Sequence, residues 1–427
     1  MPSRFRSAAP HFIFSKLEHL ARISGLIRRR SRKFSAEGFL LSLIQCVTRG
    51  TSSIHHLALS LAGFERDSMS RQAMYQRLSP ASTGFLVRVL REILSSGGRA
   101  SIQTSNALPF GRILVEDSTV ISMSKSNAHH FPNNGNGKAV TAGCKINLVT
   151  EAISGLPVDA ALHDARSPDQ SIAFDLPDEC LPGDLILRDR GYFCYDALQT
   201  IESREAFWIS RLPASVAAFD AEGTELERVL SSTRASRVEM DLWLGRKRAH
   251  RCRLVATRLS KKVAEKNRRQ RRRDSRRRGV TPSQRGLIHD EWSLLITNLP
   301  GERVTTRQVY QLYSIRWSIE IQFRAMKQSS HLHHSLNHKA DPFQIEALLL
   351  AVIIRHALTI DLQAKLNETL DGKQRVSIEK LSDAFSHFLL GLDHSNKLAT
   401  FRFDPRHVVH EKRKRSTLYA ITVQSLT

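Results

Sequence analysis

Residues 309–328 read VYQLYSIRWSIEIQFRAMKQ, and the interpretation of the whole chain starts from this stretch. Ile315, Ile319 and Phe323 recur at helical spacing, which predicts one helix seated on a core. Four polar side chains share about a 60° arc beside that apolar stripe: Tyr313, Arg316, Glu320 and Lys327. A tyrosine, two cations and a carboxylate on one face suit a site that handles phosphate. The alternative is a solvated surface helix laced with Arg–Glu and Glu–Lys ion pairs, and this stretch alone does not decide between the two.

The composition indicates a large, basic, globular protein. The 427 residues suffice for about two to three domains with a sizeable core. Lys and Arg number 64 against 41 Asp and Glu, so the formal net charge is +23 and the pI is near 10.4. So large an excess attracts polyanions, and nucleic acid is the default partner. Binding to a ribosome or to a membrane surface is the competing interpretation.

Neither the cysteines nor the apolar runs indicate secretion or membrane insertion. The five cysteines are scattered without a C-x-x-C pair, which favours a reducing compartment and argues against a zinc module. The longest apolar run, ALLLAVII at 347–354, is too short to span a bilayer and reads as a buried helix. The N-terminus shows no recognisable signal peptide. We therefore expect a soluble, intracellular protein.

The first hundred residues have the pattern of a helical domain. Segments 52–63 and 70–79 predict two short helices separated by a tight turn, an arrangement that resembles a helix-turn-helix DNA reader. The second helix would present polar side chains to DNA: Arg71, Gln72, Tyr75, Gln76 and Arg77. A helical bundle with a polar outer face explains the same pattern, so the DNA-binding interpretation depends on the overall charge.

Two β-branched, apolar segments carry acidic residues where strands are expected. Residues 111–123, GRILVEDSTVISM, read as a buried strand that contains Asp117. Residues 183–193, GDLILRDRGYF, read as a second strand with Asp189 at its C-terminal end and Gly191 allowing a sharp turn. An Asp within a buried strand is costly unless it is paired or binds a metal; the alternative for Asp117 is a cap that leads into a turn. With the hairpin and helix predicted between the two segments, the pattern is that of a mixed α/β layer.

A charged segment separates these strands from the 309–328 stretch. Residues 214–260 alternate between apolar and charged positions, which predicts a β-rich segment. From Arg258 to Arg278 there are twelve Lys and Arg against two acids. This run is either an exposed helix along DNA phosphates or a disordered loop that grips the backbone, and a solvated linker is the third possibility. The residues expected to contact DNA are Arg268, Arg269 and Arg272.

Three separated carboxylates stand out: Asp117, Asp189 and Glu320. Divalent-metal catalysis on phosphodiesters needs hard oxygen ligands from different elements, and Mg²⁺ is usually held by one or two carboxylates plus substrate oxygens and water. Two such ions about 4 Å apart activate the attacking oxygen and stabilise the leaving one. Arg316 and Lys327 can hold a phosphate nearby. Spacing alone is only suggestive, because many basic proteins contain scattered acids.

The same residues match a family signature. Tyr313, Arg316, Glu320 and Lys327 complete the pattern Y-x2-R-x3-E-x6-K, which resembles the signature of the DDE transposases of bacterial insertion sequences in the insertion-sequence-four family. LVEDSTVI around Asp117 looks like the first acidic motif of that family, and LRDRGYF around Asp189 looks like its second. EWSLLITN is similar to the family's strand that carries a tryptophan beside the flipped base, here Trp292. The match covers about residues 110–360, in the right order.

The resemblance implies a fold and a reaction. The fold class would be α/β, an RNase H-like mixed-sheet catalytic core with an inserted β-rich subdomain, preceded by a helical N-terminal DNA-binding domain. Asp117, Asp189 and Glu320 would bind Mg²⁺, for which Mn²⁺ substitutes. The reaction would be cut-and-paste transposition: nicking at the element's end, attack by the freed 3′-OH on the opposite strand to form a hairpin, hairpin resolution, and strand transfer into target DNA.

The resemblance also implies DNA contacts and partners. Tyr313, Arg316 and Lys327 would bind terminal phosphates, and Trp292 would stack on or wedge beside an extruded base. For Tyr313 and Trp292, packing inside the core is the alternative. The partners would be double-stranded DNA, as transposon ends and target, and a second copy of the chain in a DNA-bound homodimer, with no membrane partner. The expected location is the bacterial cytoplasm, at the nucleoid.

The expected boundaries are 1–100 for the helical domain, 110–213 and 291–370 for the two parts of the core, 214–290 for the insertion, and 371–427 for a helical and basic tail. Two other functions stay open at this point. One is a catalytically inactive DNA-binding regulator derived from such an element, and the other is an RNase H-like DNA nuclease.

Overall fold

The structure is a computed structural model that describes residues 11–29, 31–97, 110–134, 140–173, 180–331, 336, 338–368, 370, 375–392 and 408–409. Most of the helical and basic tail predicted for 371–427 lies outside these residues. No helix in the described part of the chain is long and apolar enough to cross a lipid bilayer.

The described residues form two compact units, each assembled from segments that are far apart in the sequence. The helical unit takes its residues from 1–101, 118–167 and 317–417. The sheet unit takes its residues from 102–117 and 168–316. The long strand β1 (Arg112–Met123) begins in the sheet unit and ends in the helical unit.

The helical unit combines helices from both ends of the chain with three strands. Its helices are α1 (His11–Ile23), α2 (Ala36–Arg49), α3 (Ile54–Ala62), α4 (Arg71–Arg77), α5 (Pro80–Gly97), α12 (Ser318–Ser330), α14 (Pro342–Glu368) and α15 (Ile378–Leu390), and its short 3-10 turn is η1 (Lys125–Asn127). Its strands are β2 (Pro132–Asn133), β3 (Thr141–Glu151) and β4 (Pro157–Asp164), besides the second half of β1. β3 and β4 form an antiparallel hairpin, as the sequence predicted.

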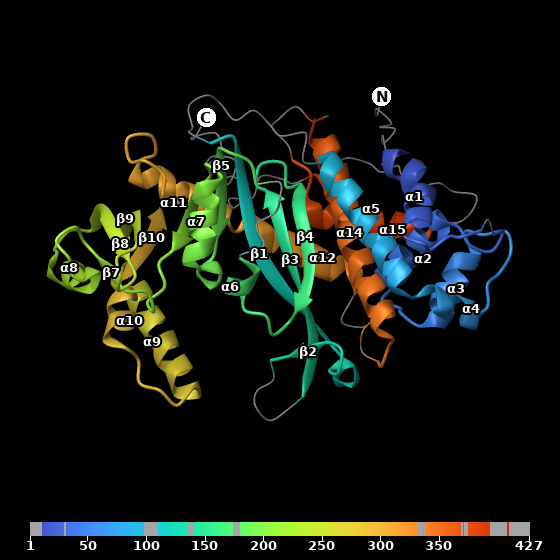
Figure 1. Cartoon of the computed structure of the whole chain (residues 1–427), viewed down its shortest axis with the longest axis horizontal. Helices are drawn as coiled ribbons and strands as arrows, with labels where there is room; N and C mark the ends of the chain where they lie inside the picture. The colour runs from blue at the N-terminus through green and yellow to red at the C-terminus, as the bar shows by residue number, and fades with distance from the viewer. Residues whose placement is uncertain are drawn as a thin grey trace. The chain divides into compact units, whose positions relative to one another are not determined.

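Local sequence explains where these helices start and why they pack. The side chains of Ser35, Ser53 and Ser70 cap α2, α3 and α4 by accepting a hydrogen bond from a backbone N–H of the first turn. The apolar run at 347–354 is buried throughout and lies within α14, which packs beside α5 (Figure 1). Burial of this run on all sides makes α14 the central helix of the unit.

The sheet unit is a mixed sheet with helices around it. Its strands follow the order β1, β5 (Asp184–Arg188), β6 (Phe207–Arg211), β10 (Trp292–Thr297), β9 (His250–Arg258), β8 (Arg237–Leu244) and β7 (Ala218–Phe219). Its helices are α6 (Asp169–Ile172), the 3-10 turn η2 (Arg190–Tyr192), α7 (Tyr195–Ser203), α8 (Leu226–Ser232), α9 (Lys261–Arg277), α10 (Gln284–His289) and α11 (Thr306–Ile315). β1, β5 and β6 are parallel, whereas β10 is antiparallel to both β6 and β9. A mixed α/β class with a helical N-terminal region is therefore confirmed.

Two buried ion pairs hold β1 against β5. Arg112 and Asp184 face each other in the parallel register, and their side chains approach to 2.6 Å. Four residues along, Glu116 and Arg188 face each other at 2.6 Å with the charges reversed between the strands. Between the pairs β1 contributes only Ile, Leu and Val, which are buried as expected for a parallel sheet covered on both faces.

One prediction about the signature stretch is wrong. Residues 309–328 do not form one helix, because α11 ends at Ile315 and α12 begins at Ser318. Across the break, the backbone N–H groups of Arg316 and Glu320 donate to carbonyls three residues back instead of four. This tighter turn divides the stretch into two helices. The first helix carries Tyr313 and belongs to the sheet unit, and the second carries Glu320 and Lys327 and belongs to the helical unit.

The buried pair nearest the start of β1 gives a test of stability. Arg112→Met leaves the Asp184 carboxylate, 2% exposed, without its cation, so we expect the free energy of unfolding to fall by about 3–5 kcal/mol. The double variant Arg112→Met, Asp184→Leu removes both charges and should recover most of that loss. Urea unfolding of the two variants and the wild type measures the difference. A single variant as stable as the wild type would contradict this account of the sheet.

Candidate active site

Asp117 and Asp189 lie next to each other where the parallel pairing of β1 with β5 ends. The last paired positions of β1 and β5 are Glu116 and Arg188, and the two aspartates follow them immediately. The backbone at Asp189 remains extended, with φ −78° and ψ 168°. Because side chains alternate across a sheet, both aspartates point to the face opposite the buried Glu116–Arg188 pair. The sheet thus presents two partly exposed carboxylates side by side, on strands about 5 Å apart.

The turn after Asp189 is shaped by a glycine. A β-carbon at Gly191 would lie 2.9 Å from a carboxylate oxygen of Asp169 on α6, so a larger residue there would force that side chain to move. The next two residues, Tyr192 and Phe193, are buried and secure the turn to the core. The sequence Asp189-Arg190-Gly191-Tyr192-Phe193 therefore aims one carboxylate outward from a tightly packed corner.

Tyr313 packs against Asp189. Its hydroxyl donates to the Asp189 carboxylate and to the Arg188 carbonyl, each at 3.4 Å, and its side chain is 7% exposed. The Arg211 guanidinium lies over its ring at 5.6 Å from the centroid. Burial, followed by the nearby Asp189 charge, raises the pKa of Tyr313 to about 12, so the phenol keeps its proton near neutral pH.

Arg316 neutralises the other aspartate. One of its terminal nitrogens lies 2.9 Å from a carboxylate oxygen of Asp117, and both side chains are mostly buried. Two neighbouring carboxylates repel each other unless a cation or a hydrogen-bond donor compensates them. The Arg316 guanidinium compensates the Asp117 carboxylate through an ion pair, and the Tyr313 hydroxyl compensates the Asp189 carboxylate through a hydrogen bond.

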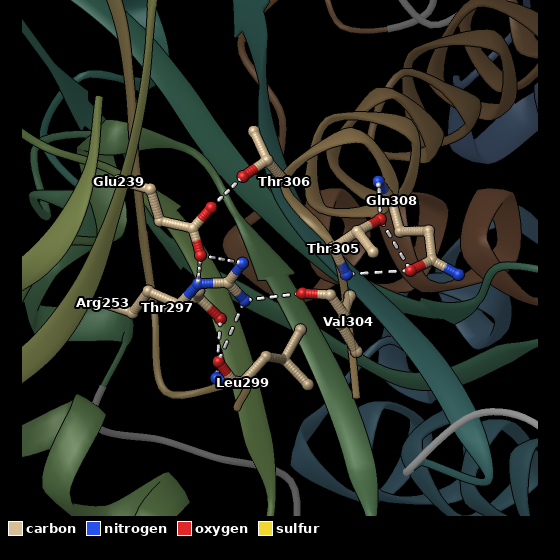
Figure 2. A network of polar contacts seen from close by, with 8 residues as sticks. All are labelled: Glu239, Arg253, Thr297, Leu299, Val304, Thr305, Thr306 and Gln308. Carbon is tan, nitrogen blue, oxygen red and sulfur yellow. Dashed lines mark hydrogen bonds and ion pairs between the residues drawn. The ribbon is translucent and has the colours of Figure 1, made fainter. Parts of the chain in front are cut away.

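A polar network sets the start of α11, the helix that carries Tyr313 (Figure 2). Arg253 donates to Glu239 at 2.9 Å and to the carbonyls of Leu299 and Val304 at 3.3 and 2.7 Å. Glu239 also accepts from the Thr306 hydroxyl, which is the largest cause of its lowered pKa. Thr305 and Gln308 then form a reciprocal capping box at the first turn. Strands β8 and β9 thereby position α11, which carries Tyr313 and is followed directly by Arg316.

The other two signature residues belong to the helical unit. Glu320 lies in the first turn of α12 and Lys327 in its last. Both are partly exposed, and burial lowers the pKa of Lys327. The structure therefore brings Asp117 and Asp189 together within one unit and places Glu320 in the other. Among the residues described, no three acidic, histidine or cysteine side chains gather as a metal-binding cluster.

Trp292 and the basic run lie around a cavity of the sheet unit. Trp292 is 4% exposed, with the Arg258 guanidinium 4.6 Å from its ring centroid. It lines a cavity of about 630 Å³ together with Arg190 and Gly191, which follow Asp189 in sequence, and with Arg271 of α9. The basic run is the helix α9, in which Arg269 and Arg272 are exposed while Arg268 pairs with Glu291.

The predicted DNA reader has the expected helices. In α4 the side chains of Arg71, Gln72 and Gln76 are exposed, as is Tyr75, whose hydroxyl donates to Asp341. Arg77 instead donates to the Leu26 carbonyl and lies over the Phe34 ring, so it holds α4 in place.

Sequence reasoning missed several residues that shape the site. Neither Glu116 nor Arg188 was predicted to matter, although each stands four residues after the charged residue that begins its strand pair, Arg112 or Asp184. No sequence pattern marked Arg253 and Glu239, because Arg253 contacts Val304, 51 residues away, and Glu239 contacts Thr306, 67 residues away. Trp317 was passed over too, yet it stands 60% exposed at the break between α11 and α12.

Comparisons with known proteins match the part of the chain that contains these site residues. Residues 108–355, more than half of the chain, match the family described as Transposase DDE domain. The chain is 27% identical over 369 residues to the transposase for insertion sequence element IS231B of Bacillus thuringiensis subsp. berliner, a match that covers 81% of this chain and 77% of that one. It is 20% identical over 407 residues to the transposase for insertion sequence element IS1151 of Clostridium perfringens, with 90% and 86% covered.

One solved structure is also similar to this chain, with a lower sequence identity. The piggyBac transposase, in a synaptic complex with hairpin DNA, covers 89% of this chain and 78% of its own with 14% identity and a TM-score of 0.44. The family match includes Asp117, Asp189 and Glu320 and carries the RNase H-like fold class that the sequence predicted. The chain therefore belongs to the DDE transposases of bacterial insertion sequences, enzymes that cut DNA and transfer its strands.

Proposed function

We propose that this transposase moves its element by a cut-and-paste route that passes through a DNA hairpin at the terminal inverted repeats. The observation that carries the proposal is the placement of Asp117 and Asp189 side by side on one face of the sheet. That arrangement provides a site for hydrolysis at the element's end. Water hydrolyses one phosphodiester bond there and frees the 3′-OH of the element. This 3′-OH attacks a phosphodiester of the opposite strand and displaces the 3′-oxygen of the flanking DNA, which closes the hairpin. Water then opens the hairpin and restores the 3′-OH, which joins target DNA by displacing a 3′-oxygen of the target strand.

The residues fit a divalent cation. The Asp117 and Asp189 carboxylates are hard oxygen donors and are only partly buried, as a site that shares its metal with substrate and water requires. Glu320 is proposed as the third ligand, with Mg²⁺ as the ion and Mn²⁺ as its substitute. When bound, the metal activates the attacking oxygen and stabilises the leaving one. Arg316, which lies 2.9 Å from the Asp117 carboxylate, would stand beside these ligands, where its guanidinium could also bind a DNA phosphate.

The other predicted site residues are assigned to DNA contacts according to the chemistry of their side chains. Lys327 and Arg316 bind phosphates of the terminal nucleotides, and Tyr313 orients Asp189 through its hydroxyl besides any contact with DNA. Trp292, which lines the cavity, stacks on or wedges beside an extruded base. The exposed side chains of α4 read the terminal repeat. Two ends must be held together for insertion, so the working form is a DNA-bound homodimer acting at the bacterial nucleoid.

Loss of any one carboxylate should stop the chemistry without stopping DNA binding. For Asp117→Asn, Asp189→Asn and Glu320→Gln we expect Mg²⁺-dependent nicking of a terminal-repeat duplex to fall by about 10²- to 10³-fold or more. Asp196→Asn, the same change at an exposed position of α7, is the matched control and should retain the wild-type rate. Nicking and band-shift assays measure the two properties. Full activity in the three variants would rule out this site.

The hairpin step has its own signature. With an end-labelled terminal-repeat duplex, a denaturing gel should show a strand of about twice the length appearing after the nick and disappearing as the end is released. The order follows from attack by the freed 3′-OH on the opposite strand. Release of the double-strand break without that species would contradict the hairpin route while leaving membership of the family untouched.

The hydroxyl of Tyr313 should have a small, pH-independent effect. Tyr313→Phe removes two long hydrogen bonds, so we expect nicking to slow by about 3- to 10-fold, in line with roughly 1 kcal/mol. Because the pKa of Tyr313 is raised to about 12, the phenol is protonated at every pH below about 10, and the pH–rate profile should keep its shape. Tyr310→Phe is the control on the same helix, since that hydroxyl donates to the Ser293 carbonyl at 2.6 Å. An inflection that vanishes only in Tyr313→Phe would mean that the phenol itself transfers a proton.

A further inference from the structure

Helix α9 is fixed to the sheet unit along one side. Ala264 is its buried residue, and Asn267 donates to the Asp290 carbonyl at 3.3 Å. Arg271 makes a two-pronged contact with the Asp290 carboxylate, at 2.8 Å for each nitrogen, which also raises its pKa. One turn away, Arg268 pairs with Glu291. These contacts join α9 to the two residues that precede Trp292 in β10 and set which side of the helix faces outward.

The opposite side of α9 is a row of exposed cations. At about 100° per residue, six of them fall within an arc of roughly 100° centred away from Ala264 and Arg271. They are called the cationic ridge: Lys262, Lys266, Arg269, Arg273, Arg276 and Arg277. Arg269 lies 3.7 Å from Glu265, but both side chains are more than 60% exposed, so this ion pair hardly reduces the charge of the ridge.

The stability of the helix does not explain the ridge. Like charges three and four residues apart repel each other. The first turn holds no acid and begins with Lys261 and Lys262, where the helix dipole disfavours cations. The basic residues at the C-terminal end are favourable, but those at the N-terminal end and in the middle are not. A row of this kind is stabilised when a polyanion neutralises it.

The position of α9 indicates which polyanion. One flank of the helix, with Asn267, Gln270 and Arg271, lines the same 630 Å³ cavity as Arg190 and Gly191, the residues that follow Asp189. From Lys262 to Arg277 the ridge is about 22 Å long, which exceeds the roughly 12 Å width of the major groove of duplex DNA. Cations at its two ends can therefore reach phosphates on both sides of a groove.

We propose that the cationic ridge binds the phosphate backbone of the transposon-end duplex that Asp117 and Asp189 cleave, without reading its sequence. The proposal rests on the placement of cleavage at these two aspartates. It assigns Arg268 and Arg271 to anchoring the helix and the six exposed cations to the DNA. Phosphate contacts of this kind fix the position of a duplex and leave base recognition to other elements.

The test compares triple variants of the full-length chain. Arg269→Gln, Arg273→Gln, Arg276→Gln neutralises one half of the ridge, and Lys262→Gln, Lys266→Gln, Arg277→Gln neutralises the other. The control Arg228→Gln, Arg234→Gln, Arg237→Gln removes the same charge from exposed arginines of the same unit. Binding is measured between about 50 and 200 mM salt on a terminal-repeat duplex and on a scrambled duplex of equal length.

Either half-ridge variant should weaken binding to both duplexes by roughly 10- to 100-fold near 0.1 M salt. The slope of log affinity against log salt should fall by about 2.7, which is 0.9 for each of three phosphate contacts. The preference for the terminal repeat should stay unchanged, and the control should match the wild type. Thermal unfolding without DNA should occur close to the wild-type temperature, because each variant relieves repulsion within α9 but also loses one favourable cation of its last turn. If one half-ridge variant is misfolded, the other decides.

Two results would overturn the proposal. One is a wild-type salt slope in both half-ridge variants. The other is unchanged binding and nicking of the end, with a defect confined to joining pre-cut ends to target DNA, which would assign the ridge to the target. At saturating protein the half-ridge variants should nick at the wild-type rate, whereas Asp117→Asn should stay inactive. Activity in Asp117→Asn would therefore refute the proposed cleavage site independently of the ridge.

Discussion

The two buried ion pairs between β1 and β5 are the constraint from which the site follows. Arg112 with Asp184 and Glu116 with Arg188 have opposite polarity along the strands. A slip of four residues in either direction would set Arg112 against Arg188 or Glu116 against Asp184, and a slip of two would leave buried charges without partners. Each alternative costs several kcal/mol, so the pairs specify one register even if they add little net stability. That register is what sets Asp117 beside Asp189.

Holding two carboxylates together creates a second requirement, which the sheet cannot meet alone. Their mutual repulsion must be compensated, and both compensating groups come from the C-terminal half of α11 and the residue after it. The position of α11 depends in turn on Arg253, which joins the insertion strands to the loop before the helix. Strands β8 and β9 thus contribute to the position of the site although they supply no carboxylate.

The sequence predicted what depends on local pattern. The acidic strands, the hairpin and the long buried helix lie where periodicity and turn chemistry placed them. It failed where distant contacts decide. The break after Arg316 has no glycine or proline to announce it, and it occurs where the Arg316 side chain reaches back to Asp117, 199 residues earlier. Burial of Trp292 under Arg258 and the outward face of α9 likewise depend on partners that no spacing reveals.

The same limit applies to the net charge of +23, which suggested nucleic acid at the outset. The arginines fall into two groups, those buried against acceptor groups of the protein and those exposed to solvent. Arg112, Arg188 and Arg253 are largely buried against carboxylates or carbonyls, so their charge is already compensated inside the protein and cannot attract DNA. The cations of α9 on the side away from Ala264 have no comparable buried acid, and their charge acts on the surroundings. Total charge therefore indicated the class of partner, but only the folded positions separate arginines that build the site from those that can meet its substrate.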